Sequence, residues 1–488
     1  MRKAVVLVAY TVLTAFGLNC SAFAAFNYSE TYGISTRAMS MGRAFTAIAD
    51  DYSALCYNPA GLAQTTRTTI SVNLIQPFHN LEVKYLNSPE IDPYYRGQDM
   101  KMYDGRGYVY NDPVKGSDGD NLDIFLPVFG MSLNINRLVS AIVDIPINVQ
   151  VGLVAGFPEN SNSLFTTHTI GPDMPDFIAF GDQIEHLLVT FGLGLEIKKD
   201  LVYMGWSSTL GIKMVGDRPL QIYGVWLGYD PKINTIITQA ESPAYIELSQ
   251  RWGVLFTPFK KKMKIGFQYR ESSDTVTVDF TPIRVMETNG SIPQWQLVRE
   301  DIALGYFPEQ LSVGLAVSVG LFTVSFDYRF QRWSDFEYTD ILYNLYVIDE
   351  RGQISGGYNP DSPDFEDTEQ FSVGVEYELD KNISLTAGYE FRPTPVPDQS
   401  YRITNYLDMD KDIFSIGANY KLNAYTKIGA VLQYMMLKDY KVYKTGDETG
   451  YAWGWDKVGV NGRPPDLQKS YEVNGDAFVI GLSVEFSL

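Results

Sequence analysis

The stretch FTVSFDYRF, residues 322–330, alternates apolar and polar side chains over its whole length. Every second side chain from Phe322 to Phe330 is apolar, and the four between them are polar, with Asp327 and Arg329 carrying charge. Successive side chains of a strand point to opposite faces of a sheet. The stretch therefore predicts a β-strand with one wholly apolar face and one wholly polar face.

The same alternation recurs along most of the chain, and where it is most regular the apolar face carries no charged side chain. We expect fourteen strands, at about residues 68–76, 126–136, 147–157, 187–197, 201–214, 244–258, 262–281, 308–319, 321–333, 366–379, 382–394, 411–422, 426–438 and 475–488. A soluble β-sandwich would show the same period, so the alternation alone does not identify the solvent of the apolar face.

The lengths of the connections are more informative. Tight turns at Val319-Gly320, Asp380-Lys381 and Asn423-Ala424 alternate with long segments at 334–365, 395–410 and 439–474. Outer-membrane barrels combine short periplasmic turns, long external loops and an even strand count. The sequence therefore predicts an all-β fold, a 14-stranded antiparallel transmembrane β-barrel in the outer membrane, which we expect to be a monomer surrounded by lipid. Trp252 and Trp333 near strand ends suit its interfacial aromatic girdles.

The first residues predict a secretory signal peptide at 1–24. Arg2 and Lys3 precede an uncharged apolar run, and small residues stand before a cleavage site after Ala24. A lipoprotein site at Cys20 is the alternative, but Asn19 occupies the position where such a site has a small residue. Cleavage after residue 24 would leave one cysteine, which excludes an intramolecular disulfide.

Composition excludes several classes of function. Removing residues 1–24 changes the formal net charge from −19 to −21, which argues against a nucleic-acid partner. The three histidines, His79, His168 and His186, adjoin no serine nucleophile motif and lack zinc-site spacing. The acidic alternation from Asp408 to Asp412 lacks the glycine and glutamate of a calcium loop. We therefore expect neither an enzyme nor a cofactor or metal.

Residues 44–64, AFTAIADDYSALCYNPAGLAQ, break the period of two. The apolar spacing from Phe45 to Leu55 is helical and stops at Asn58. Asn58 is a good N-cap and Pro59 suits a first helical position, so a new short helix is expected over residues 59–63. The alternative is a simple turn that joins the leader to the first strand.

The segment from Arg37 to Asp51, continued by YNPAGLA at 57–63, resembles the N-terminal hatch of the FadL/TodX family. These are outer-membrane transporters of long-chain fatty acids and other hydrophobic molecules. Weaker resemblance lies in residues 266–270, 326–334 and 387–397. The resemblance implies a hatch at residues 25–66 that plugs a barrel at 67–488, with Asn58, Pro59, Ala60 and Gly61 at its constriction.

The resemblance also implies a route for the ligand. It is captured among external loops, passes to a lumenal site above the hatch and leaves sideways at a kinked third strand. Gly152, Gly156 and Pro158 are the candidates for that opening because they can bend a strand or break its pairing. The order Gly156-Phe157-Pro158 departs from the Pro-Phe-Gly order of the family.

Phe45, Arg270 and Arg329 are the candidate ligand contacts. Either arginine could pair with a ligand carboxylate. Alternatively, both pair with inward acids such as Asp327 and Glu376, because a buried charge needs a partner.

The function expected from the sequence is therefore outer-membrane uptake of hydrophobic molecules, with long-chain fatty acids as the first candidate. An alternative is a FadL-like barrel that acts as a docking or shuttle component for exported proteins through its long loops. A general porin is a third possibility, and it predicts conductance of polar solutes with the hatch in place.

Overall fold

The computed structural model describes residues 28–85, 125–140, 145–157, 176–177, 179–180, 187–214, 219–222, 236–239, 244–259, 262–273, 277–279, 284–285, 296–303, 306–336, 342–348, 354–355, 364–400, 406–443 and 471–488. The expected signal peptide lies outside the described residues, as do Pro158, His168 and His186. Among the residues in these ranges, no helix has the length and apolar character needed to cross a bilayer.

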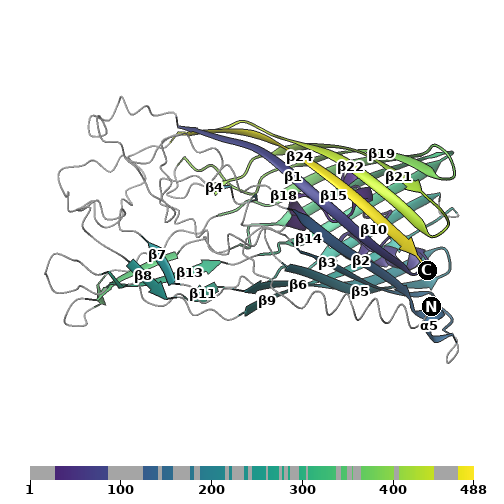
Figure 1. Cartoon of the computed structure of the whole chain (residues 1–488), viewed down its shortest axis with the longest axis horizontal. Coiled ribbons are helices and arrows are strands. Elements are labelled where there is room, and N and C mark those ends of the chain that lie inside the picture. The colour runs from purple at the N-terminus through teal and green to yellow at the C-terminus, as the bar shows by residue number, and fades with distance from the viewer. Residues whose placement is uncertain are drawn as a thin grey trace.

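One large antiparallel sheet closes on itself (Figure 1). Its barrel strands are β1 (Thr69–Tyr85), β2 (Leu126–Asn134), β3 (Val149–Gly156), β5 (Leu187–Lys198), β6 (Val202–Met214), β9 (Ala244–Phe256), β10 (Met263–Arg270), β14 (Glu309–Val319), β15 (Phe322–Arg332), β18 (Thr368–Glu378), β19 (Ile383–Arg392), β21 (Lys411–Lys421), β22 (Thr426–Leu437) and β24 (Tyr471–Ser487). A short fifteenth strand, β23 (Tyr440–Val442), pairs beside β24. Strands β1 and β24 close the ring from Thr69 opposite Ser487 to Tyr85 opposite Tyr471. The 14-stranded barrel expected from the sequence is confirmed.

The barrel is apolar outside and polar inside. In β15 the Phe326 side chain is 44% exposed, whereas its neighbour Asp327 is 2% exposed. The pattern repeats in β14, where Leu311 and Val313 face outward and Ser312 is buried. Soluble monomers rarely expose continuous apolar surface on this scale, so the outer face is the one that contacts lipid.

The long connections contain small sheets of their own. These are β11 (Thr277–Asp279), β13 (Gln296–Ala303), β16 (Leu342–Ile348) and β17 (Ile354–Ser355); β12 (Arg284–Val285), β8 (Ile236–Gln239) and β7 (Pro219–Ile222); and the parallel pair β20 (Tyr406–Leu407) and β4 (Asp176–Phe177). Figure 1 shows β7, β8, β11 and β13 beyond one end of the barrel and the C-terminus at the other. The short helix α5 (Ile135–Val139), between β2 and β3, lies at the C-terminal end.

Three expectations about the strands need correction. Strand β1 continues to Tyr85 because its whole length pairs with β24. The strand expected at 262–281 ends at Arg270, since the following backbone turns to bond the segment before β14, with the Ser273 N–H donating to the Phe307 carbonyl. Trp333 is only 5% exposed and packs inward against Tyr306, so its girdle assignment is wrong.

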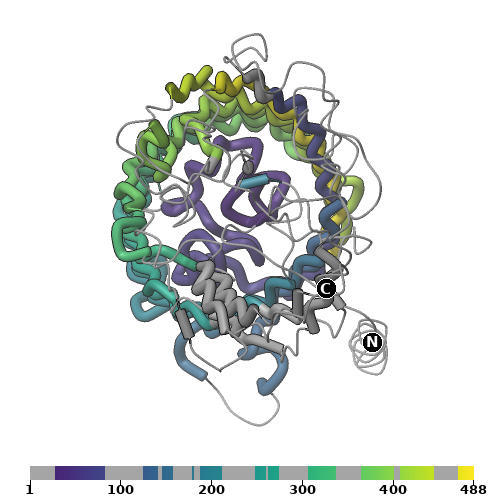
Figure 2. Tube along the Cα trace, turned by 90° about the vertical axis from the view of Figure 1, so that its left-hand side faces the viewer, coloured from purple at the N-terminus to yellow at the C-terminus, as the bar shows by residue number. Residues whose placement is uncertain are grey.

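The hatch lies inside the ring of strands, as Figure 2 shows. Its elements are α2 (Tyr28–Thr31), α3 (Thr36–Ser40), α4 (Ala54–Tyr57) and the 3-10 helix η1 (Pro59–Gln64). The helix predicted from the apolar spacing of 45–55 is wrong except for its last turn, because Ala49 has a φ of 24° and interrupts it. The short helix expected after Asn58 is confirmed as η1.

Candidate functional site

Asn58, one of the residues expected at the constriction, bonds two parts of the hatch and the barrel wall. Its Oδ1 accepts the Ala60 N–H at 3.2 Å and caps η1, while its Nδ2 donates to the Thr46 carbonyl at 2.8 Å. A second contact from Nδ2, at 3.3 Å, reaches the carbonyl of Val254 in barrel strand β9. Pro59, Ala60 and Gly61 follow as buried residues of η1. The Asn58 side chain therefore caps η1 and also bonds the hatch to the barrel wall.

Glycines of the barrel wall lie where atoms of the hatch approach the strands most closely. A Cβ added at Gly205 of β6 would lie 2.2 Å from the Pro59 carbonyl carbon, and one added at Gly253 of β9 would lie 2.0 Å from the Asn58 Oδ1. Other wall glycines would clash with hatch atoms at 2.8 Å or less: Gly130, Gly156, Gly194, Gly266, Gly374 and Gly388. These contacts of the wall glycines were not predicted from the sequence. The signal that marks them is a glycine at an inward-facing strand position.

Ion pairs and charge-assisted hydrogen bonds fix the hatch laterally. Arg37 of α3 donates two hydrogen bonds to Glu376 of β18, at 3.2 and 2.8 Å, and also pairs with Asp50. Asp327 of β15 accepts the backbone N–H groups of Phe45 and Thr46 at 2.9 and 2.8 Å. The wall thus supplies carboxylates to the hatch from two strands.

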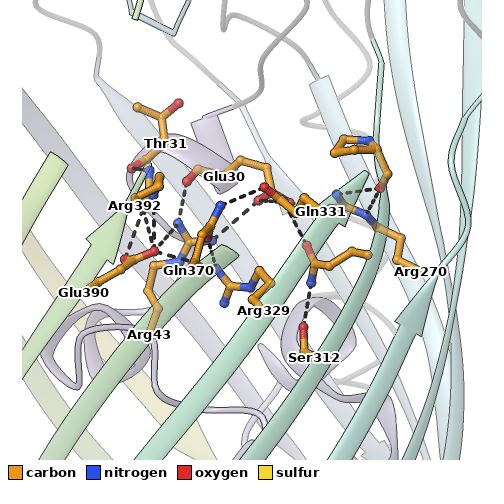
Figure 3. Close-up of polar contacts among 12 residues, drawn as sticks. Glu30, Thr31, Arg43, Arg270, Ser312, Arg329, Gln331, Gln370, Glu390 and Arg392 are labelled. Atoms are coloured by element: carbon orange, nitrogen blue, oxygen red, sulfur yellow. Dashed lines mark hydrogen bonds and ion pairs between the residues drawn. The ribbon is translucent and has the colours of Figure 1, made fainter. Parts of the chain in front are cut away.

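A second network of arginines and glutamates lies on the side of the hatch that faces the long connections (Figure 3). Arg270 pairs with Glu30 of α2 and donates to the Pro308 carbonyl at 3.2 and 3.0 Å. Arg329 bonds the Gln370 Oε1 at 2.9 Å and lies 3.7 Å from Glu390. Both candidate arginines therefore pair with acids, but Asp327 and Glu376 are not those acids because hatch groups already occupy them.

Glu30 is the one hatch carboxylate of this network. Arg270 and Arg43 both pair with it, the latter at 3.6 Å. Burial by itself would raise the pKa of Glu30, but the two guanidinium groups outweigh it and hold that pKa well below its usual range. Glu30 is thus a carboxylate at neutral pH, held by guanidinium groups of the wall and of the hatch.

A cavity of about 30 Å³ lies between the hatch and the wall. Arg43, Arg251, Arg270 and Arg329 line it together with Glu30. Phe45 is fully buried in the hatch, edge-on to Tyr57 with ring centroids 5.6 Å apart, and is not among the lining residues. The cavity therefore combines four guanidinium groups with an apolar lining that includes Val154, Leu188 and Phe307.

Strand β3 is fully paired over its described length. Gly152 pairs with Ser132 and Gly192, and Gly156 pairs with Val128 and Leu188. A Cβ at Gly156 would lie 1.7 Å from the Tyr28 hydroxyl, so this glycine makes room for the hatch. Pro158, the third candidate for a lateral opening, lies outside the described residues.

A plugged barrel of fourteen strands can be compared with known proteins. A model of the family described as outer membrane protein transport protein (OMPP1/FadL/TodX) matches residues 245–488, half of the chain. The chain belongs to this family of outer-membrane transporters of hydrophobic compounds. FadL-family barrels are transport proteins rather than enzymes, and the outer membrane is their location.

Relatives of this FadL-family chain cover nearly all of it. Alkane uptake protein A of Marinobacter nauticus is 21% identical over 440 residues, which is 87% of each chain. A FadL homologue of Pseudomonas aeruginosa superimposes with a TM-score of 0.52 at 14% identity, covering 96% of this chain and 99% of that one. The toluene transporter TodX of P. putida gives 0.52 at 12% identity, with the same coverage. The structural matches show the shared fold.

The described residues contain no cluster of three or more His, Cys, Asp or Glu side chains suited to a metal. The ion pairs of Glu30, Arg43 and Glu390 between hatch and wall were not predicted from the sequence. Glu390 gave a signal, since it is a charged residue on the polar face of a strand. Glu30 and Arg43 gave none, because their partners are distant in sequence.

Proposed function

We propose that this FadL-family barrel takes up long-chain fatty acids, and that an acidic head group is what releases the hatch. The observation that carries the proposal is the ion pair between Arg270 of the wall and Glu30 of the hatch. It lies on the side of the hatch that faces the long connections, where a ligand captured by external loops would arrive. A ligand carboxylate offers Arg270 the same chemistry as Glu30 does.

If a ligand carboxylate replaces the Glu30 carboxylate, the buried guanidinium group of Arg270 keeps a negatively charged partner throughout the exchange. A ligand without an acid would instead leave a bare charge, which is strongly unfavourable in a buried site. Loss of the Glu30 contact frees α2, and Tyr28 belongs to the same short helix. Because Tyr28 packs against Gly156 of β3, movement of α2 would uncover that strand and favour lateral release.

Lateral release also suits the energetics of an alkyl chain. Re-exposing its apolar surface to water costs about 25 cal/mol per Å². A path from the lumen through the wall into lipid avoids most of that cost, whereas a path down a polar bore does not.

A hydrocarbon is the second candidate substrate. Two relatives are named for alkane uptake and for toluene transport. In addition, Arg270 and Arg329 already have carboxylate partners, so neither requires an acidic ligand. The docking alternative makes a separate prediction, a stoichiometric protein partner in the purified sample.

The test compares palmitate with hexadecane, which has the same number of carbons and no acid. Cells that lack other transporters of this kind express the wild type, Glu30→Gln or Glu309→Gln. The uptake rate of each labelled compound is then measured. Glu309 pairs with Arg332 outside the cavity and is the matched control. We expect faster palmitate uptake with Glu30→Gln, unchanged uptake with Glu309→Gln and no saturable hexadecane uptake. Saturable hexadecane uptake that is insensitive to Glu30→Gln would favour the hydrocarbon and reject our proposal.

A further inference from the structure

Arg251 of β9 lacks a carboxylate partner within the described part of the chain. Its side chain is 6% exposed and its Nη1 donates to the Leu55 carbonyl of the hatch at 2.9 Å. The Nε of Arg251 is buried without any hydrogen-bond partner. The Nε atoms of Arg43 and Arg329, which line the same cavity, share that condition.

The charges around the cavity do not balance. Its described surroundings hold five guanidinium groups, of Arg43, Arg251, Arg270, Arg329 and Arg392, against three carboxylates, of Glu30, Asp327 and Glu390. The excess is two positive charges around a partly open space, and the Arg251 side chain itself is 6% exposed. A buried charge without a counter-charge is strongly unfavourable, and a guanidinium group does not neutralise by losing its proton at ordinary pH.

The cavity has the size and the donors for a small anion. A cavity of about 30 Å³ is large enough for a group the size of a water molecule or a small ion. Besides the arginines, the hydroxyl groups of Thr190 and Thr209 line it. They bond each other at 3.0 Å, which leaves one of the two O–H groups to donate, whereas the Ser249 hydroxyl already donates to the Glu271 carbonyl. N–H and O–H donors around a cationic centre are the environment that a halide prefers, whereas a metal cation would be repelled.

We propose that the cavity beside Arg251 binds one small inorganic monovalent anion, with chloride as the physiological occupant. The anion compensates Arg251, and it sits where the wall meets the carbonyl of Leu55 and the thiol of Cys56. It therefore joins the hatch to strand β9 without any protein carboxylate. This inference is independent of which hydrophobic compound the barrel carries.

Bromide is the probe that locates the site. Crystals of the full-length detergent-solubilised protein are grown with sodium bromide as the halide, and anomalous data are collected at the bromine edge. We expect a peak within hydrogen-bonding distance of Arg251 in the wild type. The peak should be lost in Arg251→Gln and kept in Arg67→Gln, which removes the same charge from an exposed residue near the short turns. A wild-type cavity that holds no bromide, or holds a lipid head group instead, overturns the proposal.

A solution measurement covers the case in which Arg251→Gln does not crystallise or fold. The thermal midpoint of the wild type is measured in sodium chloride and in sodium gluconate at equal ionic strength. Because a ligand that binds only the native state stabilises it by mass action, the midpoint should be higher in chloride and rise with chloride concentration. Arg67→Gln should keep that dependence, and Arg251→Gln should lose it. Equal midpoints for the wild type in the two salts contradict the proposal.

Discussion

Arg37 of the hatch and Glu376 of the barrel wall face each other through two hydrogen bonds, from Nε to Oε1 at 3.2 Å and from Nη2 to Oε2 at 2.8 Å. The residues are 339 positions apart in the chain. Their side chains are 15% and 13% exposed, so water screens the pair only partly. A bidentate pair of this kind fixes orientation as well as distance. It therefore holds α3 in one position against β18.

Breaking this pair should loosen the hatch. In Arg37→Gln and Glu376→Gln we expect faster alkylation of Cys56, the single cysteine after residue 24. A double-mutant cycle on the rates should give a coupling energy of about 1–3 kcal/mol, because the two side chains are in direct contact. Arg37→Gln leaves the Glu376 carboxylate without its partner, whereas in Glu376→Gln the guanidinium group of Arg37 keeps Asp50. Additive effects of the two substitutions would mean that the pair does not seat the hatch.

Cys56 is a suitable reporter because the closed hatch protects it. Burial raises the pKa of its thiol, and the nearby Arg251 guanidinium only partly offsets that rise. The thiolate is the reactive form, so alkylation of the wild type at pH 8 should be slow. Cys56 is half-buried and lines the cavity, so rapid labelling of the wild type at that pH would contradict its raised thiol pKa.

The close approach of Gly205 to the hatch can be tested by adding a side chain at that position. Gly205→Val places a side chain where a Cβ would already lie 2.2 Å from the Pro59 carbonyl carbon. Overpacking costs about 1–3 kcal/mol, so the displaced hatch should become roughly tenfold more populated and Cys56 alkylation should accelerate accordingly. The control is Ala430→Val on the exposed outer face of β22, where the same kind of enlargement meets lipid. If both variants label at the wild-type rate, the wall does not contact η1 as described.

Two substitutions at Asn58 distinguish its capping of η1 from its hydrogen bonds to Thr46 and to the barrel wall. Asn58→Ala removes the cap on η1, worth about 1 kcal/mol, together with both donated hydrogen bonds. Asn58→Asp keeps the accepting oxygen but turns a carboxylate toward the carbonyls of Thr46 and Val254. We therefore expect Asn58→Asp to speed Cys56 alkylation at least as much as Asn58→Ala. Wild-type behaviour of Asn58→Asp would assign the whole effect to the cap.

Deletion of residues 25–64 tests the hatch as a plug. We expect low conductance from the intact protein in planar bilayers and a clear increase after the deletion, because the bore is polar and otherwise filled. The barrel strands begin at Thr69, so the deletion leaves their pairing intact. Unchanged conductance would remove the basis for calling residues 25–66 a hatch, and high conductance of the intact protein would favour a general porin.

Acid should weaken the hatch over a defined range. Burial would raise the pKa of Asp50, but the Arg37 guanidinium lowers it to about 2. A carboxylate whose pKa is lower in the seated hatch stabilises that state above its free pKa of about 3.9 and loses this effect as the pH falls toward 2. Conductance should stay low between about pH 8 and 5 and rise below about 4. In Arg37→Gln the acid-induced increase should be smaller, and an equal increase would exclude this pair as its cause.

The sequence by itself determined the barrel and the short helix that follows Asn58. Alternation is a property of the local backbone, since neighbouring side chains of a strand point to opposite faces whatever lies beyond. That is why residues 322–330 could be assigned an apolar face and a polar face, and the connection lengths then indicated lipid as the solvent of the apolar face. Asn58 and Pro59 were readable for the same reason, because capping involves residues only two apart.

Only the tertiary structure decided which charges meet. Arg270 pairs with Glu30 across 240 positions, and Asp327 bonds the hatch backbone across 282. Such pairs depend on strand register and on the path of the hatch through the bore, and composition carries neither. The same holds for the helix expected at 45–55, where the wall contacts of Phe45 and Thr46 and the positive φ of Ala49 leave turns instead. That Arg251 has no carboxylate partner among the described residues became visible only from the placement of its neighbours.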